Sequence, residues 1–320
     1  MMPHFMKQTR EFFQRESGQT HGRLVHYTTA EAALNIIRTK RIWMRNTNCM
    51  SDYSEVQHGY QILNNFFRNK EKKESFTEAL DNCMPGVASE AINVFDNSWR
   101  DIQLNTYIAC LSEHQDNEDL NGRLSMWRAF GGTTTRIGVV FRVPYISLSN
   151  LALNIIFSSV AYLSEPATHK DLEEVIENIR ANRDYLRMID RNALIKLVFL
   201  TFLFRVVCLK HEGFHEEREW RAIYAPTLGP YASMLGPSRL MESSTEVVSG
   251  VPQVVYKVPL DASVSDQIAD LDFTQIFDHL IIGPTPYPWP IYGAFVDELT
   301  KAGVANSAER VLVSGIPIRA

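Results

Sequence analysis

Two carboxylates separated by a single residue, Glu217 and Glu219, stand directly before a stretch over 220–224 that predicts a strand. Because side chains alternate along a strand, both carboxylates would point to the same side. Two like charges this close raise the pKa of one of them unless an arginine or a cationic ligand lies between them, and Arg218 and Arg221 are close at hand. The pair is therefore a candidate catalytic site, with an exposed, salt-bridged strand entry as the alternative.

A second group of candidates is His26-Tyr27-Thr28, where a short strand over 24–27 is expected to lead directly into a capped helix. A neutral imidazole can donate or accept one hydrogen bond to a ribose or phosphate oxygen, and the amides at the start of the helix could meet a pyrophosphate. Arg45 ends the next predicted strand, over 41–45, and offers its planar fork of donors to a phosphate. A structural role for His26 in the core is as well supported as a role in binding a ligand.

Four further residues have a structural interpretation beside the functional one. Asp52 and Glu55 begin the next predicted helix, where the helix dipole stabilises cap and first-turn carboxylates, and a role in a site is equally open. Trp127 and Phe130 stand at helical spacing, which indicates core packing more often than a platform for a substrate.

The composition is that of a globular chain with a full core, since 45% of the 320 residues are hydrophobic and 22% are charged. A net charge of −5 argues against the broad basic surface that binds duplex nucleic acid through its phosphates. A narrow basic groove for a single strand stays open, and its candidate residues are Arg123, Arg128, Arg136 and Arg142.

The cysteine pattern and the apolar segments bear on the cellular location. The four cysteines are scattered without metal-ligand spacing, so neither a zinc site nor a disulfide framework is predicted. The polar N-terminus shows no secretory signal, and we expect a reducing, cytoplasmic location. The longest apolar run, 194–209, is interrupted by Lys196 and Arg205 and is too short for a membrane span, so it predicts a buried helix and no membrane contact.

The order of the predicted elements indicates an α+β fold with a split, mixed or antiparallel sheet and helical insertions. We expect a helical lead-in over residues 1–22 and a single domain over 23–320. A helical insertion over about 55–104 and a pair of helices over about 170–207 interrupt the strands. Residues 226–252 are rich in Gly, Pro and Ser and predict a long irregular loop of the kind that carries binding sites.

Five motifs in order resemble the bacterial DUF2971 family. They are H-Y-T at 26–28, S-D-x-x-E at 51–55, C-L-S at 110–112, M-W-R-A-F-G-G at 126–132 before a G-V-V-F strand, and E-x-E-W-R at 217–221. The resemblance covers about 24–283. The chain departs from the family pattern at Ser51, where the family has asparagine, and at Phe130, where it has tyrosine; both changes put a role of these positions in doubt.

The same order is distantly similar to the ADP-ribosyltransferase fold, including its nucleic-acid-modifying branch. The resemblance implies that a split sheet grips NAD as a substrate, with His26 on the ribose and Tyr27 or Tyr162 on the nicotinamide ring. It implies Glu219 as the catalytic carboxylate and Glu217 as the residue that orients or deprotonates the acceptor. A carboxylate suits this chemistry, because breaking the nicotinamide–ribose bond develops an oxocarbenium-like cation that a fixed anion stabilises.

Three functions from different classes follow. The first is an NAD-dependent transferase or glycohydrolase, as a toxin or phage-defence effector that modifies a nucleic acid, a nucleotide or a protein, with a regulatory or antitoxin partner. The second is a non-catalytic sensor that uses Glu217 and Glu219 to bind an arginine or another basic ligand. The third is a metal-dependent nuclease built on Asp52, Glu55, Glu217 and Glu219.

Overall fold

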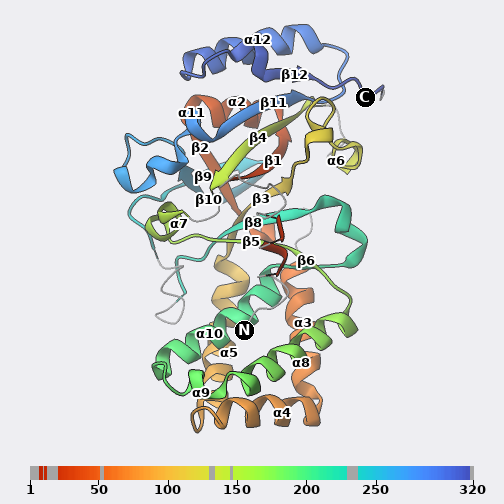
Figure 1. The fold of residues 1–320 in the computed structure, drawn as a ribbon. Helices are drawn as coiled ribbons and strands as arrows, with labels where there is room; N and C mark the ends of the chain where they lie inside the picture. Colours follow the sequence, from red (N-terminus) through yellow and green to blue (C-terminus); the bar gives the residue numbers. More distant parts are fainter. Residues whose placement is uncertain are drawn as a thin grey trace.

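A large, mostly antiparallel sheet forms one half of the molecule, and a body of helices forms the other (Figure 1). The computed structural model describes residues 7–9, 11–12, 21–50, 54–129, 134–144, 147–228 and 237–317. The sheet strands are β1 (His21–Thr29), β2 (Arg41–Asn46), β3 (Tyr107–Glu113), β4 (Arg136–Pro144), β5 (Ile156–Ser159), β8 (Glu219–Tyr224), β9 (Glu242–Val248), β10 (Val251–Pro259), β11 (Phe277–Ile282) and β12 (Val311–Val313). The predicted α+β class is confirmed.

The sheet divides at β3. The order is β12-β11-β4-β1-β3-β2-β10-β9, and β8 and then β5 branch from β3. One edge of β3 pairs with β8 over 107–112, so the other edge must serve both β1 and β2. There β1 pairs only with the end of β3, at Ser112 and Glu113, and β2 only with its start, at Tyr107 and Ile108. Strands β1 and β2 therefore separate along the middle of β3.

The two predicted helical segments pack into a single helical body below the sheet (Figure 1). Its helices are α3 (Glu55–Arg68), α4 (Lys70–Asp81), α5 (Val87–Asn105), α8 (Glu165–Ala181), α9 (Arg183–Leu186) and α10 (Arg191–Val207). Helix α10 is apolar on nearly every face and lies against α3 and α5, which confirms the predicted buried helix. The approach to α3 is close, because a Cβ on Gly59 would stand 2.8 Å from the carbonyl oxygens of Arg205 and Val206.

The upper face of the sheet is covered by α2 (Ala30–Thr39), α11 (Phe273–Ile276) and α12 (Pro288–Lys301), which share one apolar core with it (Figure 1). The predicted strand-to-helix unit is present, since Thr29 ends β1 and its hydroxyl accepts a hydrogen bond from the amide of Ala32. Short elements complete the chain: α6 (Leu124–Ala129), α7 (Leu148–Leu153), η1 (Thr47–Cys49), η2 (Asp116–Glu118), η3 (Glu212–Glu217), η5 (Asp266–Leu271), η6 (Ser307–Arg310), and the parallel pair β6 (Ala161–Tyr162) and β7 (Leu209–Lys210).

The prediction of an irregular loop over 226–252 is wrong for the second half of this range, which forms β9 and the start of β10. Strand β9 pairs along its whole length with β10, and the hairpin turns at Ser249 and Gly250, which both have positive φ, 51° and 80°. A turn with two such residues matches the twist of a hairpin. The strand escaped prediction because β9 lies at the edge of the sheet and five of its seven residues are polar. Residues 229–236 lie outside the described residues.

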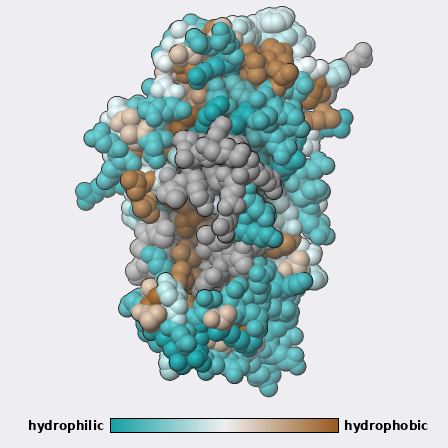
Figure 2. Space-filling model, viewed as in Figure 1, coloured by the Kyte–Doolittle hydropathy of each residue, from teal (hydrophilic) through white to brown (hydrophobic). Residues whose placement is uncertain are grey.

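Hydrophilic side chains cover most of the visible surface of both halves (Figure 2). None of the described helices is both long and apolar enough to cross a membrane. Of the predicted lead-in over 1–22, residues 7–9 and 11–12 are helical, and β1 begins at His21.

Candidate functional site

Glu217 and Glu219 meet at a lysine that the sequence analysis did not single out. The ammonium of Lys210 lies 2.7 Å from Oε2 of Glu217 and 3.4 Å from Oε2 of Glu219. The geometry differs from the predicted alternation, because Glu217 ends η3, Arg218 takes a left-handed conformation (φ 43°), and β8 begins only at Glu219. The two carboxylates are thus joined by a cation from β7.

Arg221 and Glu55 complete this arrangement, which we call the charge cluster: Glu55, Lys210, Glu217, Glu219 and Arg221. Arg221 follows Glu219 by two residues on β8, and its Nε lies 2.8 Å from Oε1 of Glu219. Its Nη2 lies 3.0 Å from Oε2 of Glu219 and also contacts Glu55. Lys210 lies 2.8 Å from the other oxygen of Glu55. The cluster joins α3, β7, η3 and β8, so it anchors the helical body to the sheet.

The charge cluster shifts the pKa values of Glu219, Glu55 and Lys210. Burial would raise the pKa of Glu219, but the attraction of Arg221 and Lys210 outweighs it and lowers that pKa to about 2. Burial raises the pKa of Glu55 in spite of the same two cations. Burial works to lower the pKa of Lys210, and the surrounding carboxylates nevertheless hold it above its ordinary value. Glu219 is therefore an anion at neutral pH and does not serve as a proton donor.

His26 of β1 contacts the same segment of β3 that pairs with Arg221 of the charge cluster. Its Nδ1 is 2.8 Å from the carbonyl oxygen of Cys110, at the place where β1 has left β3. Cys110 pairs with Arg221 across the strands, and burial together with the nearby charge of Glu219 raises the pKa of its thiol. Burial lowers the pKa of His26, so the ring is neutral near pH 7. One residue, Cys110, thus connects His26 with Glu219.

The aromatic candidates divide between two places. Tyr162 is at the charge cluster, where its hydroxyl accepts a hydrogen bond of 2.7 Å from the amide of Glu219. Tyr27 and Trp127 are buried and pack edge to face, with ring centroids 4.8 Å apart. The Tyr27 hydroxyl accepts from the amide of Arg123, and Gly138 leaves room for both rings. These two rings are core residues.

The other candidates lie around the division of the sheet. Thr28 is half-buried on β1, before the cap of α2. Arg45 is half-buried on β2 and donates to the carbonyl oxygen of Cys49, and burial lowers its pKa. Asp52 lies outside the described residues, as do Ser51 and Phe130.

The four arginines proposed for a basic groove do not share one free surface. Arg123 is nearly buried and binds Glu118 as well as the backbone carbonyls of Glu216 and Glu217. Arg142 pairs with Asp278. Arg128 is exposed, and Arg136 is half-buried.

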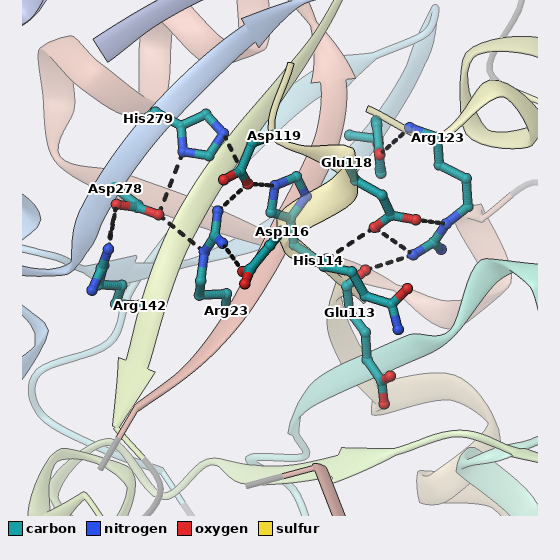
Figure 3. A network of polar contacts seen from close by, with 12 residues as sticks. Arg23, Glu113, His114, Asp116, Glu118, Asp119, Arg123, Arg142, Asp278 and His279 are labelled. Carbon is teal, nitrogen blue, oxygen red and sulfur yellow. Dashed lines mark hydrogen bonds and ion pairs between the residues drawn. The ribbon is translucent and has the colours of Figure 1, made fainter. Parts of the chain in front are cut away.

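A second polar cluster, which sequence reasoning missed, lies at the end of β3 (Figure 3). Arg23 of β1 donates to Asp116 at 2.6 Å and to Asp278 at 3.1 Å, and it also contacts Asp119. Arg142 lies 3.1 Å from Asp278. Burial works to raise the pKa of the Asp278 carboxyl, but His279, Arg142 and Arg23 outweigh burial and lower it.

Two histidines belong to this second cluster. Nε2 of His114 lies 2.8 Å from Oδ1 of Asp119, and Nδ1 of His279 lies 3.4 Å from Oδ2 of Asp278. Burial, together with the nearby Arg23, lowers the pKa of His114 to about 4. The only signals in the sequence are an acidic run after the C-L-S strand and an Asp-His pair far along the chain.

Comparison with known proteins gives one match. A family model described as "Protein of unknown function (DUF2971)" matches residues 126–222. No curated protein and no solved structure matches this chain. The matched range contains Glu217, Glu219, Arg221 and Lys210, while His26 and Glu55 precede it. Over residues 126–222 the chain is therefore similar to DUF2971, the family that its motifs predict.

Proposed function

We propose that this protein is an ADP-ribosyltransferase-like enzyme or an NAD glycohydrolase, with Glu219 as the fixed anion of its site. The observation that carries the proposal is a buried Glu219, ionised at neutral pH, that lies beside Cys110, whose carbonyl oxygen contacts a neutral His26 where β1 and β2 separate. A fixed carboxylate in a dry setting is the group that stabilises an oxocarbenium-like cation.

In the proposed reaction the bond between the ribose and nicotinamide breaks, and neutral nicotinamide leaves with the electron pair. An acceptor oxygen or nitrogen, or water, then forms the new bond to the ribose carbon. Glu217 is the carboxylate best suited to receive the acceptor's proton, because it is more exposed than Glu219 and is held by Lys210. The acceptor is a nucleic acid, a nucleotide or a protein if the enzyme is a toxin or phage-defence effector.

The counter-ions of Glu219 favour a second candidate, a non-catalytic binding module. Both oxygens of Glu219 already accept hydrogen bonds from Arg221, so a ligand would find a carboxylate whose charge is balanced inside the protein. In a binding module, the charge cluster would hold the fold together, and Glu217, its more exposed carboxylate, would bind the basic ligand. The nuclease alternative has less support, because Lys210 occupies the position between the carboxylates where a divalent metal would bind.

The test is nicotinamide release from NAD by the purified full chain, alone and with RNA, DNA or cell lysate as the acceptor. The variants are Glu217→Gln and Glu219→Gln, and the matched control is Glu216→Gln, because Glu216 is exposed next to the site. Calorimetry measures NAD affinity, and circular dichroism verifies that each variant is folded.

If the protein is an enzyme, the wild type and Glu216→Gln release nicotinamide, whereas folded Glu217→Gln and Glu219→Gln lose turnover and keep their affinity for NAD. A binding module predicts no release under any condition. Absence of both release and NAD binding by the folded wild type would refute the enzyme proposal.

A further inference from the structure

The second polar cluster brings together three side chains that are common metal ligands. His114 follows β3, Asp119 follows η2, and His279 lies on β11 (Figure 3). One ligand atom from each of the three lies within 4.8 Å of the other two. We propose that His114, Asp119 and His279 form a binding site for a divalent transition metal, and that Zn²⁺ is the metal it takes. This site is separate from the charge cluster and does not depend on the proposed reaction.

The surroundings of His279 prepare one ring nitrogen for a metal. Its Nδ1 lies 3.4 Å from Oδ2 of Asp278, so a carboxylate stands beside this ring nitrogen. A proton on Nδ1 would face Asp278 and leave the lone pair of Nε2 for a metal. Nε2 is buried, has no hydrogen-bond partner among the described residues, and lies 3.9 Å from Oδ1 of Asp119. A carboxylate behind a histidine is the usual support of a metal-binding imidazole.

His114 provides the second nitrogen from the other side of Asp119. Its Nε2 lies 2.8 Å from Oδ1 of Asp119, and its side chain is fully buried. Zn²⁺ binds imidazole nitrogen and carboxylate oxygen at about 2.0–2.2 Å, so tetrahedral ligand atoms lie about 3.3 Å apart. The separations of 2.8 and 3.9 Å from Asp119 to the two histidines lie on either side of that value. Side-chain rotations that bring the three ligand atoms, now within 4.8 Å of one another, to this separation would complete the site.

The ligand types and the charge select the class of ion. Two imidazoles and one carboxylate suit Zn²⁺ and its neighbours, whereas Mg²⁺ and Ca²⁺ prefer sites made of oxygen alone. Three carboxylates, Asp116, Asp119 and Asp278, face two guanidinium groups, Arg23 and Arg142, so the cluster carries excess negative charge. Asp119 is 37% exposed and gives an ion a path from solvent.

Arg23 supports the competing view, in which the cluster is a network of ion pairs alone. It contacts Asp119 and is itself nearly buried. It also binds Asp116 and Asp278, which would hold it in place if Asp119 turned toward a metal. The two views differ on His279: a metal site needs its Nε2, while the ion pairs of Arg23 do not include it.

The full chain is first treated with a chelator and then titrated with Zn²⁺ in a calorimeter. The absorption spectrum of the Co²⁺-loaded protein reports the types of the ligands. The decisive variant is His279→Gln, and Asp119→Asn, at a partly exposed position, is the second. The matched control is His58→Gln, because His58 is exposed on α3. Melting curves with and without Zn²⁺ establish that each variant folds.

We expect one Zn²⁺ per wild-type chain, an unchanged His58→Gln, and affinity reduced by at least about tenfold in His279→Gln and Asp119→Asn. Asp278→Asn should lower affinity by about 10–100-fold, since it removes the support of a ligand. Absence of stoichiometric binding by the wild type would overturn the proposal. Equal binding by folded His279→Gln and His58→Gln would overturn it as well.

Discussion

Replacing Glu219 by glutamine tests the electrostatics of the charge cluster. The side chain keeps its shape, but the carboxylate between Arg221 and Lys210 becomes neutral. Arg221 is only 2% exposed and would keep Glu55 as its one carboxylate partner in the charge cluster. A buried cation that loses a partner has no water to replace it, so we expect a marked loss of stability.

The magnitude follows from the pKa of Glu219. Its two cations outweigh burial and lower that pKa from 4.5 to about 2, and each pKa unit corresponds to about 1.4 kcal/mol. Glu219 therefore contributes about 3 kcal/mol to folding at neutral pH, which agrees with the ~3–5 kcal/mol lost when a buried pair loses one member. The unfolded chain binds the extra proton between pH 4.5 and about 2, so this contribution is complete above pH 4.5 and disappears as the pH falls through that interval.

Urea denaturation followed by circular dichroism measures the difference in unfolding free energy between the wild type and Glu219→Gln at each pH. The control is Glu298→Gln, which breaks the surface pair with Arg38, where water screens the charges and a much smaller change is expected. A difference of about 3 kcal/mol at pH 7 that shrinks below pH 4.5 supports the reasoning. Equal stability at pH 7, or a difference that stays constant down to pH 2, would refute it.

Two further predictions concern the helical body, and a third variant, in α12, serves as their contrast. Arg205→Met leaves the buried carboxylate of Asp171 without the guanidinium that it contacts, and should cost about 3–5 kcal/mol by urea denaturation, while the double variant with Asp171→Leu should recover most of that loss. Gly59→Ala should cost about 1–3 kcal/mol, because its Cβ would stand 2.8 Å from two backbone oxygens of α10. Gly293→Ala, in α12 with nothing within 4 Å of the new Cβ, should instead gain about 0.5–1 kcal/mol; equal melting temperatures for the two alanine variants would contradict this account.

The periodic elements were predictable from the sequence because their patterns are local. The strand-to-helix unit at Thr29, the G-V-V-F strand (β4) and the helix in the apolar run 194–209 (α10) all lie where local spacing and capping residues indicate. The strand β9 was not predictable, since an edge strand with mainly polar residues has the composition of a loop.

The candidate site was predictable only in part. Alternation along β8 places Arg221 on the same side as Glu219, and that inference needs only the local sequence. Lys210 comes from a two-residue strand that pairs with β6, and no periodicity marks it. The interpretation of Glu217 and Glu219 depended on which cation lay between them, which is a matter of tertiary structure.

The histidine pair of the second cluster shows the same limit more strongly. His114 and His279 are far apart in the chain, and neither stands at ligand spacing with a second histidine or cysteine. They meet because β1 and β11 both pair with β4, while the segment after β3 folds back over the end of the sheet (Figure 3). The order of the strands, which long-range contacts determine, is what brings them together.

Arg123 gives the two clusters a physical connection. Its side chain donates to Glu118 at 2.9 Å, within the segment that carries His114 and Asp119, and to the carbonyl oxygens of Glu216 and Glu217 at 2.8 and 3.0 Å. These carbonyls immediately precede the left-handed residue Arg218 and the start of β8. A change that moves the segment after β3 therefore acts on the backbone that positions Glu217. Because the side chain of Arg123 is 10% exposed, these hydrogen bonds are poorly replaced by water, and the coupling is correspondingly stiff.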